Sequence, residues 1–321
     1  MKIFSIYIKI IFFVLITTIT SLIFLDRIVG NKLNDIYQGW NYKGYRGLIK
    51  KEKKVDHLRI AVFGGSVSAG YGLNYRDAIP YLLEKKLLKK KIDVVNLGRN
   101  GLGIYGILHD IEDYKYLKYD IAIIHNGYND CTIKGYNLNT RNNNLIYKYF
   151  KYLTILDVYL PEKIHLLLNK EDKNALDNYY KKKEEQIKIK YKNNPNKNLS
   201  SYTCKAIFEN KKTKLIVNKK KFINHLETFS LKKYNEVLKY LVKTKKQIFV
   251  IIQPKYGDDP LQKIQSKLII EMSKKFKEVK IIDLSEKIDL NDPKISYDRL
   301  HNTKAGNELT VKILLQNLNN S

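Results

Sequence analysis

Short apolar runs alternate with longer segments of helical periodicity, and this alternation predicts an α/β fold. Buried parallel strands are covered on both faces and therefore form continuous apolar stretches. The runs that we expect to be such strands lie at 60–63, 92–97, 120–125, 247–252 and 279–284. Helices are expected at 78–91, 106–118 and 222–244, with a final helix ending near 318. The pattern predicts a three-layer α/β/α sandwich around a five-stranded parallel sheet.

The first 25 residues form an apolar segment whose only charges are Lys2 and Lys9. A bilayer core of roughly 30 Å needs about 20 apolar residues, and a lysine near one end can extend its amine to the interface. A cleaved signal peptide also begins with a basic residue followed by an apolar run. Because no convincing cleavage site precedes Asp26, we expect residues 1–25 to be an uncleaved signal anchor. The catalytic domain would then lie outside the cytoplasm.

Two further segments follow from the change in composition. Residues 26–57 are polar and rich in Tyr, Gly and Lys, as expected of a juxtamembrane linker that packs partly on the domain. Residues 58–321 then form the main domain. Within it, the stretch at about 141–221 exceeds what a strand–helix–strand crossover needs and is strongly basic. We expect a helical insertion there, which is either a solvated cap or a lid over the substrate pocket.

Ser66 follows the first predicted strand after two glycines that permit a sharp turn. A residue in this position lies at the carboxyl edge of a parallel sheet, close to a helix N-terminus, where ligands gather in open α/β folds. A serine there is a candidate nucleophile. An N-cap serine or a phosphate-binding turn explains the same local pattern. The decision depends on what the other strands bring to this edge.

Polar residues also follow the second and third strands and precede the last helix. Asn96 leads into a glycine-rich loop that contains Gly101, and Asn129 follows the third strand. Asp298 and His301 lie three residues apart, just before the final helix. Taken alone, each is explained by a turn or by the surface. Their order along the chain is more informative than any one of them.

These four short motifs, in this order, resemble the SGNH hydrolases, also called the GDSL esterase/lipase family. Gly64-Gly65-Ser66 looks like the first block, with Gly65 in place of the usual aspartate. Asn96 with Gly101, Gly127-Tyr128-Asn129-Asp130 and Asp298-Arg299-Leu300-His301 resemble the other three blocks. The resemblance covers roughly residues 58–130 and 245–318, and it implies a flavodoxin-like sheet and ester hydrolysis.

The resemblance assigns catalytic roles that fit the chemistry. A serine hydroxyl needs a base to become nucleophilic, and His301 would be that base. Asp298 would accept the other ring N–H and fix the tautomer, completing a Ser-His-Asp triad. The oxyanion hole would consist of the Ser66 and Gly101 backbone N–H groups and the Asn129 side-chain amide. No cofactor or metal is required, and His125, at the end of the third strand, is the closest rival base.

Composition narrows the choice of partners. The chain of 321 residues has 59 Lys and Arg against 32 Asp and Glu, a formal net charge of +27. Such a positive charge favours binding to nucleic acid, to an anionic membrane or to an acidic polymer. The lysines are spread along the chain, and the sequence has no zinc-finger or RNA-binding signature. Nucleic acid is therefore the less favoured partner. The two cysteines are too few for a disulfide framework.

We therefore expect a membrane-anchored serine esterase that removes an acyl group, in the first instance acetyl, from a carbohydrate or another envelope component. An O-acyltransferase or a lysophospholipase would use the same site. A catalytically idle, membrane-tethered glycan-binding module is the alternative from another class. That alternative predicts either that Ser66 and His301 lie too far apart to form a hydrogen bond or that the pocket is filled.

Overall fold

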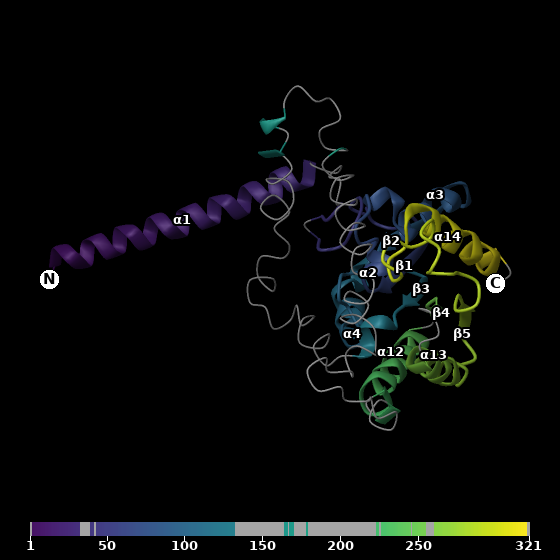
Figure 1. Ribbon diagram of the computed structural model, residues 1–321. Coiled ribbons are helices and arrows are strands. Elements are labelled where there is room, and N and C mark those ends of the chain that lie inside the picture. Colours follow the sequence, from purple (N-terminus) through teal and green to yellow (C-terminus); the bar gives the residue numbers. More distant parts are fainter. Residues whose placement is uncertain are drawn as a thin grey trace.

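A computed structural model describes residues 2–32, 39–41, 43–131, 164–165, 167–169, 178, 223–224, 226–244, 246–254 and 260–319. The basic insertion expected at about 141–221 lies almost wholly outside these ranges. The sheet, the helices that flank it and the residues at its carboxyl edge lie largely inside them (Figure 1).

The centre of the fold is a five-stranded sheet with the strand order β2-β1-β3-β4-β5. The strands are β1 (Leu58–Gly64), β2 (Ile92–Asn96), β3 (Ile121–His125), β4 (Gln247–Ile252) and β5 (Val279–Asp283). Every neighbouring pair is parallel. This is the order of flavodoxin-like doubly wound folds, whose ligands bind at the carboxyl edge of the strands. The predicted sheet is thereby confirmed, with strand ends within a few residues of those expected.

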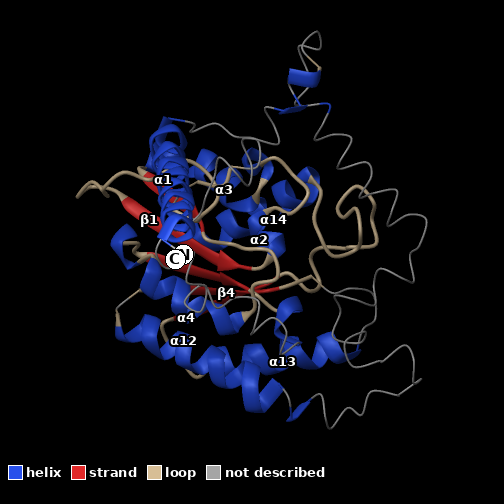
Figure 2. Ribbon diagram, turned by 90° about the vertical axis from the view of Figure 1, so that its left-hand side faces the viewer, coloured by secondary structure: helices blue, strands red, loops and turns tan. Residues whose placement is uncertain are grey.

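Helices cover both faces of the sheet, which confirms the three-layer architecture (Figure 2). The helices α3 (Ile79–Leu87) and α14 (Lys304–Asn319) pack on one face, and α4 (Ile104–Asp113), α12 (Lys232–Lys243) and α13 (Pro260–Ser273) on the other. Shorter elements connect them: α2 (Ser66–Ala69), the 3₁₀ turns η1 (Tyr75–Asp77), η2 (Leu88–Lys90), η3 (Lys115–Leu117) and η4 (Tyr128–Cys131), and the π-helix η7 (Leu226–Leu231). The long helix expected at 222–244 is therefore π-helical in its first part.

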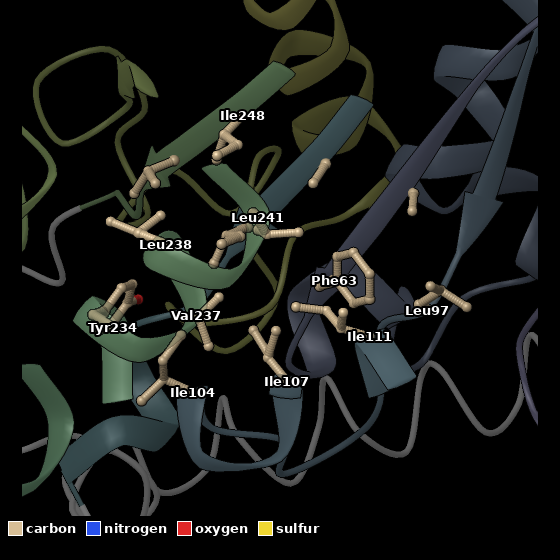
Figure 3. Close-up of a cluster of buried hydrophobic side chains, with 14 of the residues drawn as sticks. Phe63, Leu97, Ile104, Ile107, Ile111, Tyr234, Val237, Leu238, Leu241 and Ile248 are labelled. Carbon is tan, nitrogen blue, oxygen red and sulfur yellow. The ribbon is translucent and has the colours of Figure 1, made fainter. Parts of the chain in front are cut away.

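Alternating side chains of the strands separate the core into two apolar clusters. On β1, Ile60 and Val62 face the cluster under α3 and α14. Ala61 and Phe63 face the cluster under α4, α12 and α13 (Figure 3). Successive side chains of a strand point to opposite faces, so a fully apolar strand is needed where both faces are covered. This explains why the strands are continuous apolar runs rather than alternating ones.

The N-terminal segment forms one helix, α1 (Lys2–Lys32). Within it, Phe4–Asp26 is long and apolar enough to cross a membrane, and its apolar side chains are largely exposed. Between α1 and β1 the structure describes residues 39–41 and 43–57. Tyr45 is only 1% exposed and stacks edge-on against Tyr114 at the end of α4. Part of the segment expected to be a linker therefore belongs to the packed domain.

The core predicts a large stability difference between two substitutions in α3. Leu83 is fully buried between α3 and the sheet, whereas Lys85 on the same helix is exposed. We expect Leu83→Ala to lower the free energy of unfolding by about 2–5 kcal/mol. Lys85→Ala should change it by no more than about 0.5 kcal/mol. Urea denaturation of the full chain in detergent measures both, and equal effects would contradict the packing described.

Candidate active site

Ser66 stands at a sharp turn between β1 and α2. β1 ends at Gly64, Gly65 is the N-cap, and Ser66 is the first residue of the helix. A Cβ atom at Gly64 would lie 2.3 Å from Ser68 Oγ and 2.4 Å from the His125 carbonyl oxygen. These distances are too short for a side chain at position 64, so the turn requires glycine there. The turn leaves Ser66 half-buried at the carboxyl end of β1.

Three residues from two distant parts of the chain form a continuous hydrogen-bonded series at this edge of the sheet. Ser66 Oγ lies 2.8 Å from His301 Nε2. His301 Nδ1 lies 2.5 Å from Asp298 Oδ2. His301 is only 5% exposed, so both contacts are shielded from bulk water. The structure thus brings together the three residues that the sequence suggested as a triad.

The loop that carries Asp298 and His301 is held by its own polar groups. Asp298 Oδ1 accepts the backbone N–H groups of Leu300 (2.9 Å) and His301 (2.6 Å). Ser296 Oγ donates to the His301 carbonyl at 2.8 Å. Arg299 adopts a φ of +61°, a conformation that non-glycine residues seldom take. One carboxylate therefore fixes both the loop backbone and the imidazole ring, which leaves the histidine little freedom to rotate.

Two tyrosine rings flank the imidazole. The Tyr71 ring centroid lies 4.8 Å from that of His301, and the Tyr297 ring stacks on it at 5.9 Å. The Tyr297 hydroxyl donates to the Tyr71 carbonyl at 2.5 Å, which joins the loop after the nucleophile to the loop before the histidine. Both tyrosines are half-exposed.

The expected oxyanion residues occupy loops beside this turn. Asn129 Nδ2 donates to the Leu102 carbonyl at 3.1 Å, and a Cβ atom at Gly65 would lie 2.4 Å from the same nitrogen. The Asn129 amide is therefore pressed against the turn that carries Ser66. Gly101 has a φ of +73°, and a Cβ there would meet no atom within 4 Å. Glycine at 101 is thus favoured by backbone conformation, and the space beside it is open.

Asp130 is a buried carboxylate whose importance the sequence did not reveal. Its Oδ1 accepts the N–H of Ile104 at 2.6 Å, at the first turn of α4 and directly after the glycine-rich loop. Its backbone carbonyl accepts the Ser230 hydroxyl at 2.7 Å. Burial raises the pKa of Asp130 to about 7. Asp130 therefore ties the loop that carries Asn129 to the loop that carries Gly101.

His125, the rival base, is placed for a different task. It is 1% exposed, and its Nδ1 lies 2.9 Å from Ser68 Oγ rather than from Ser66. Burial lowers the pKa of His125 to about 4, so the ring is neutral near pH 7. The hydrogen bond to Ser68 joins the last residue of β3 to α2. Among the described residues, no group of three or more His, Cys, Asp or Glu side chains is placed to hold a metal ion.

Comparisons with known proteins give distant structural neighbours only. No family model matches the chain, and no curated protein matches it. Among solved structures, an acetyl xylan esterase, AlAXEase, is 13% identical, with 81% of this chain and 100% of that chain covered and a TM-score of 0.45. The lipase/acylhydrolase from Enterococcus faecalis is also 13% identical, covers 81% of this chain and 95% of its own, and has a TM-score of 0.45.

A third neighbour is a putative lipolytic protein of the G-D-S-L family from Desulfitobacterium hafniense. It is 13% identical, with 81% of this chain and 99% of that chain covered and a TM-score of 0.44. These neighbours are esterases and lipases. At such identities and TM-scores below 0.5, the activities in their names remain statements about those proteins.

The close contact between Gly65 and Asn129 predicts the effect of a minimal substitution. Gly65→Ala places a methyl group where the Asn129 amide now lies, so the amide must move. If that amide stabilises an oxyanion, kcat should fall about 10²–10³-fold, as on removal of one oxyanion donor. Steady-state kinetics of Gly65→Ala, Asn129→Ala and the double variant measure this. Additive losses would contradict a shared cause, because displacing and deleting one amide should overlap.

The raised pKa of Asp130 predicts a pH-dependent stability. The folded protein retains a proton that the unfolded chain releases between about pH 4 and 7, so this carboxyl destabilises the fold increasingly as pH rises. Asp130→Asn removes the ionisable group and, with it, this pH-dependent destabilisation. The unfolding free energy of the original chain should therefore fall, relative to Asp130→Asn, by up to roughly 4 kcal/mol across this window. Urea denaturation from pH 4.5 to 7.5 measures it, and parallel curves for the two proteins would refute the prediction.

Proposed function

We propose that this protein is a serine ester hydrolase that uses Ser66, His301 and Asp298 as its catalytic triad. The observation that supports it most directly is the continuous series of hydrogen bonds from Ser66 Oγ through the imidazole to the Asp298 carboxylate. An idle binding module would not need this geometry, and it predicts a Ser66–His301 separation beyond hydrogen-bond reach. The 2.8 Å contact argues against it.

The arrangement supports a two-step reaction. His301 Nε2 takes the hydroxyl proton as Ser66 Oγ attacks the ester carbonyl carbon, and Asp298 stabilises the imidazolium that results. His301 then gives the proton to the departing alcohol oxygen, and the acyl group remains on Ser66. A water molecule next loses a proton to His301 and attacks the acyl-enzyme. Ser66 leaves with the proton returned, and the carboxylic acid is released.

The negative charge that develops on the carbonyl oxygen needs donors that are already in place. We assign this role to the backbone N–H groups of Ser66 and Gly101 and to the Asn129 side-chain amide. The Ser66 N–H belongs to the first turn of α2, where backbone N–H groups have no partner within the helix. Asn129 lies against the same turn, and the space beside Gly101 is open. Loss of one such donor typically raises the activation barrier by about 2.7–4 kcal/mol.

For the substrate, we propose a short acyl ester, in the first instance acetyl, on a carbohydrate or another envelope component. Half-exposed Tyr71 and Tyr297 flank the imidazole and offer aromatic surface to a sugar ring. The helix Phe4–Asp26 would anchor the enzyme in a membrane with its domain outside the cytoplasm. The net charge of +27 would attract an anionic polymer or surface.

Hydrolysis of 4-nitrophenyl esters by the full chain in detergent tests the proposal. We expect turnover of the acetyl ester, a decline with longer acyl chains, and a loss of about 10⁴–10⁶-fold in kcat for Ser66→Ala and for His301→Ala. The matched control is His57→Ala, a histidine just before β1 and away from the site, which should retain full activity.

The outcomes separate the hypotheses. Preference for long acyl chains would move the assignment to lipids. Activity retained in Ser66→Ala would overturn the triad. Acyl transfer to an added sugar in excess over hydrolysis would identify the same acyl-enzyme in an O-acyltransferase.

A further inference from the structure

Arg46 is a buried arginine in the segment between α1 and β1. It is only 6% exposed. Its guanidinium group donates hydrogen bonds to the carbonyl oxygens of Ala69, of Gly70 at 2.7 Å and of Leu73 at 2.5 Å. One side chain thus binds three backbone carbonyls within five residues, at the last residue of α2 and in the loop that follows it.

The Ala69 carbonyl belongs to the last residue of α2 and the Gly70 carbonyl to its C-cap, while the Leu73 carbonyl lies in the loop that follows. The helix is a single turn, Ser66–Ala69, and the last carbonyls of any helix have no intrahelical partner. A cation at a helix C-terminus also interacts favourably with the helix dipole. A guanidinium is expensive to bury unless its N–H groups are bonded, and here the carbonyls meet that need. Arg46 therefore caps the short helix whose first residue is Ser66.

The loop that Arg46 holds contacts both sides of the candidate triad. Gly70 turns the chain with a φ of +77°, and the Tyr71 N–H then donates back to the Ser66 carbonyl at 2.9 Å. The Tyr71 ring lies against His301, and its carbonyl accepts the Tyr297 hydroxyl. A shift of this loop would therefore alter the positions of Ser66 and of the imidazole together.

Arg46 is itself held on the framework of the sheet. Its backbone N–H donates to the Asn96 carbonyl at 3.1 Å, and it forms antiparallel bridges with Asn96 and Trp40. The Tyr114 hydroxyl donates to the Gly44 carbonyl at 2.6 Å, which fastens the same segment to the end of α4. A side chain that starts from fixed backbone can hold its partners more rigidly than one on a free loop.

We propose that Arg46 is a positioning residue that sets the distance and orientation between Ser66 Oγ and His301 Nε2. The inference rests on the proposed function, because it concerns the geometry of that site. It makes residues 39–47 part of the catalytic unit, although they lie outside the region that resembles the hydrolase family. The segment that joins the N-terminal helix to the domain then does more than connect the two.

The experiment compares three variants of the full chain in detergent. Arg46→Met removes the donors but keeps much of the apolar stem, and Arg46→Lys retains the charge with a single ammonium group. The control is Arg59→Met. Arg59 is 2% exposed and likewise donates to backbone carbonyls, those of Leu117 at 2.9 Å and Lys51 at 3.0 Å, but at the opposite edge of the sheet. Both Met variants should lower Tm.

Activity and spectroscopy distinguish positioning from stability. With kcat expressed per mole of folded protein, we expect a loss of about 10²-fold in Arg46→Met and about 10-fold in Arg46→Lys, with little change in KM. Arg59→Met should stay within twofold of the original chain. The NMR resonance of the His301 Nδ1 proton should shift in Arg46→Met and remain unchanged in Arg59→Met.

Unchanged kcat and an unchanged His301 resonance in the Arg46 variants, with only Tm lowered, would overturn the proposal. If Arg46→Met does not fold, Arg46→Lys decides by the same two readouts. If the original chain hydrolyses no ester, the proposed function fails, while the His301 resonance still reports whether Arg46 positions the imidazole. Failure of the inference and failure of the function are thus separate results.

Discussion

The hydrogen bond between Ser66 and His301 joins residues 235 positions apart, and most of the structure is needed to form it. A parallel sheet directs the carboxyl end of every strand to one edge, so loops from distant parts of the chain meet there. Ser66 follows β1, Asn129 follows β3, and Asp298 and His301 lie in the segment between β5 and α14. The apolar clusters on both faces pack the helices against the sheet and so hold the strands in place.

Close backbone packing around Ser66 imposes the second constraint. Gly64 admits no side chain because Ser68 and the His125 carbonyl approach it, and a side chain at Gly65 would displace the Asn129 amide. The latter contact gives a physical reason for glycine at position 65, because the Asn129 amide already fills the space of a side chain. Buried groups beneath the edge, Asp130 and His125, then fix the loops from below.

The strands were predictable because continuous apolar runs are a local signal. Short motifs, which are local as well, suggested Ser66, Asn129, Asp298 and His301 as candidates, and their catalytic roles stay predictions. Arg46 gave no such signal, since a single arginine in a polar segment does not reveal that its partners are carbonyls 23 to 27 residues downstream. The π-helical turn at Leu226–Leu231 was also missed, because its periodicity differs little from that of an α-helix over six residues. The expected basic insertion lies almost wholly outside the described residues.

The central claim is that Ser66 is a nucleophile activated by His301, and covalent trapping tests it most directly. The full chain is treated with a fluorophosphonate, and the adduct is located by mass spectrometry of the digested protein. We expect one adduct per chain, on Ser66, which is absent in Ser66→Ala and forms at least about 100-fold more slowly in His301→Ala. No adduct on the folded protein, an adduct at another residue, or an equal rate in His301→Ala would contradict it.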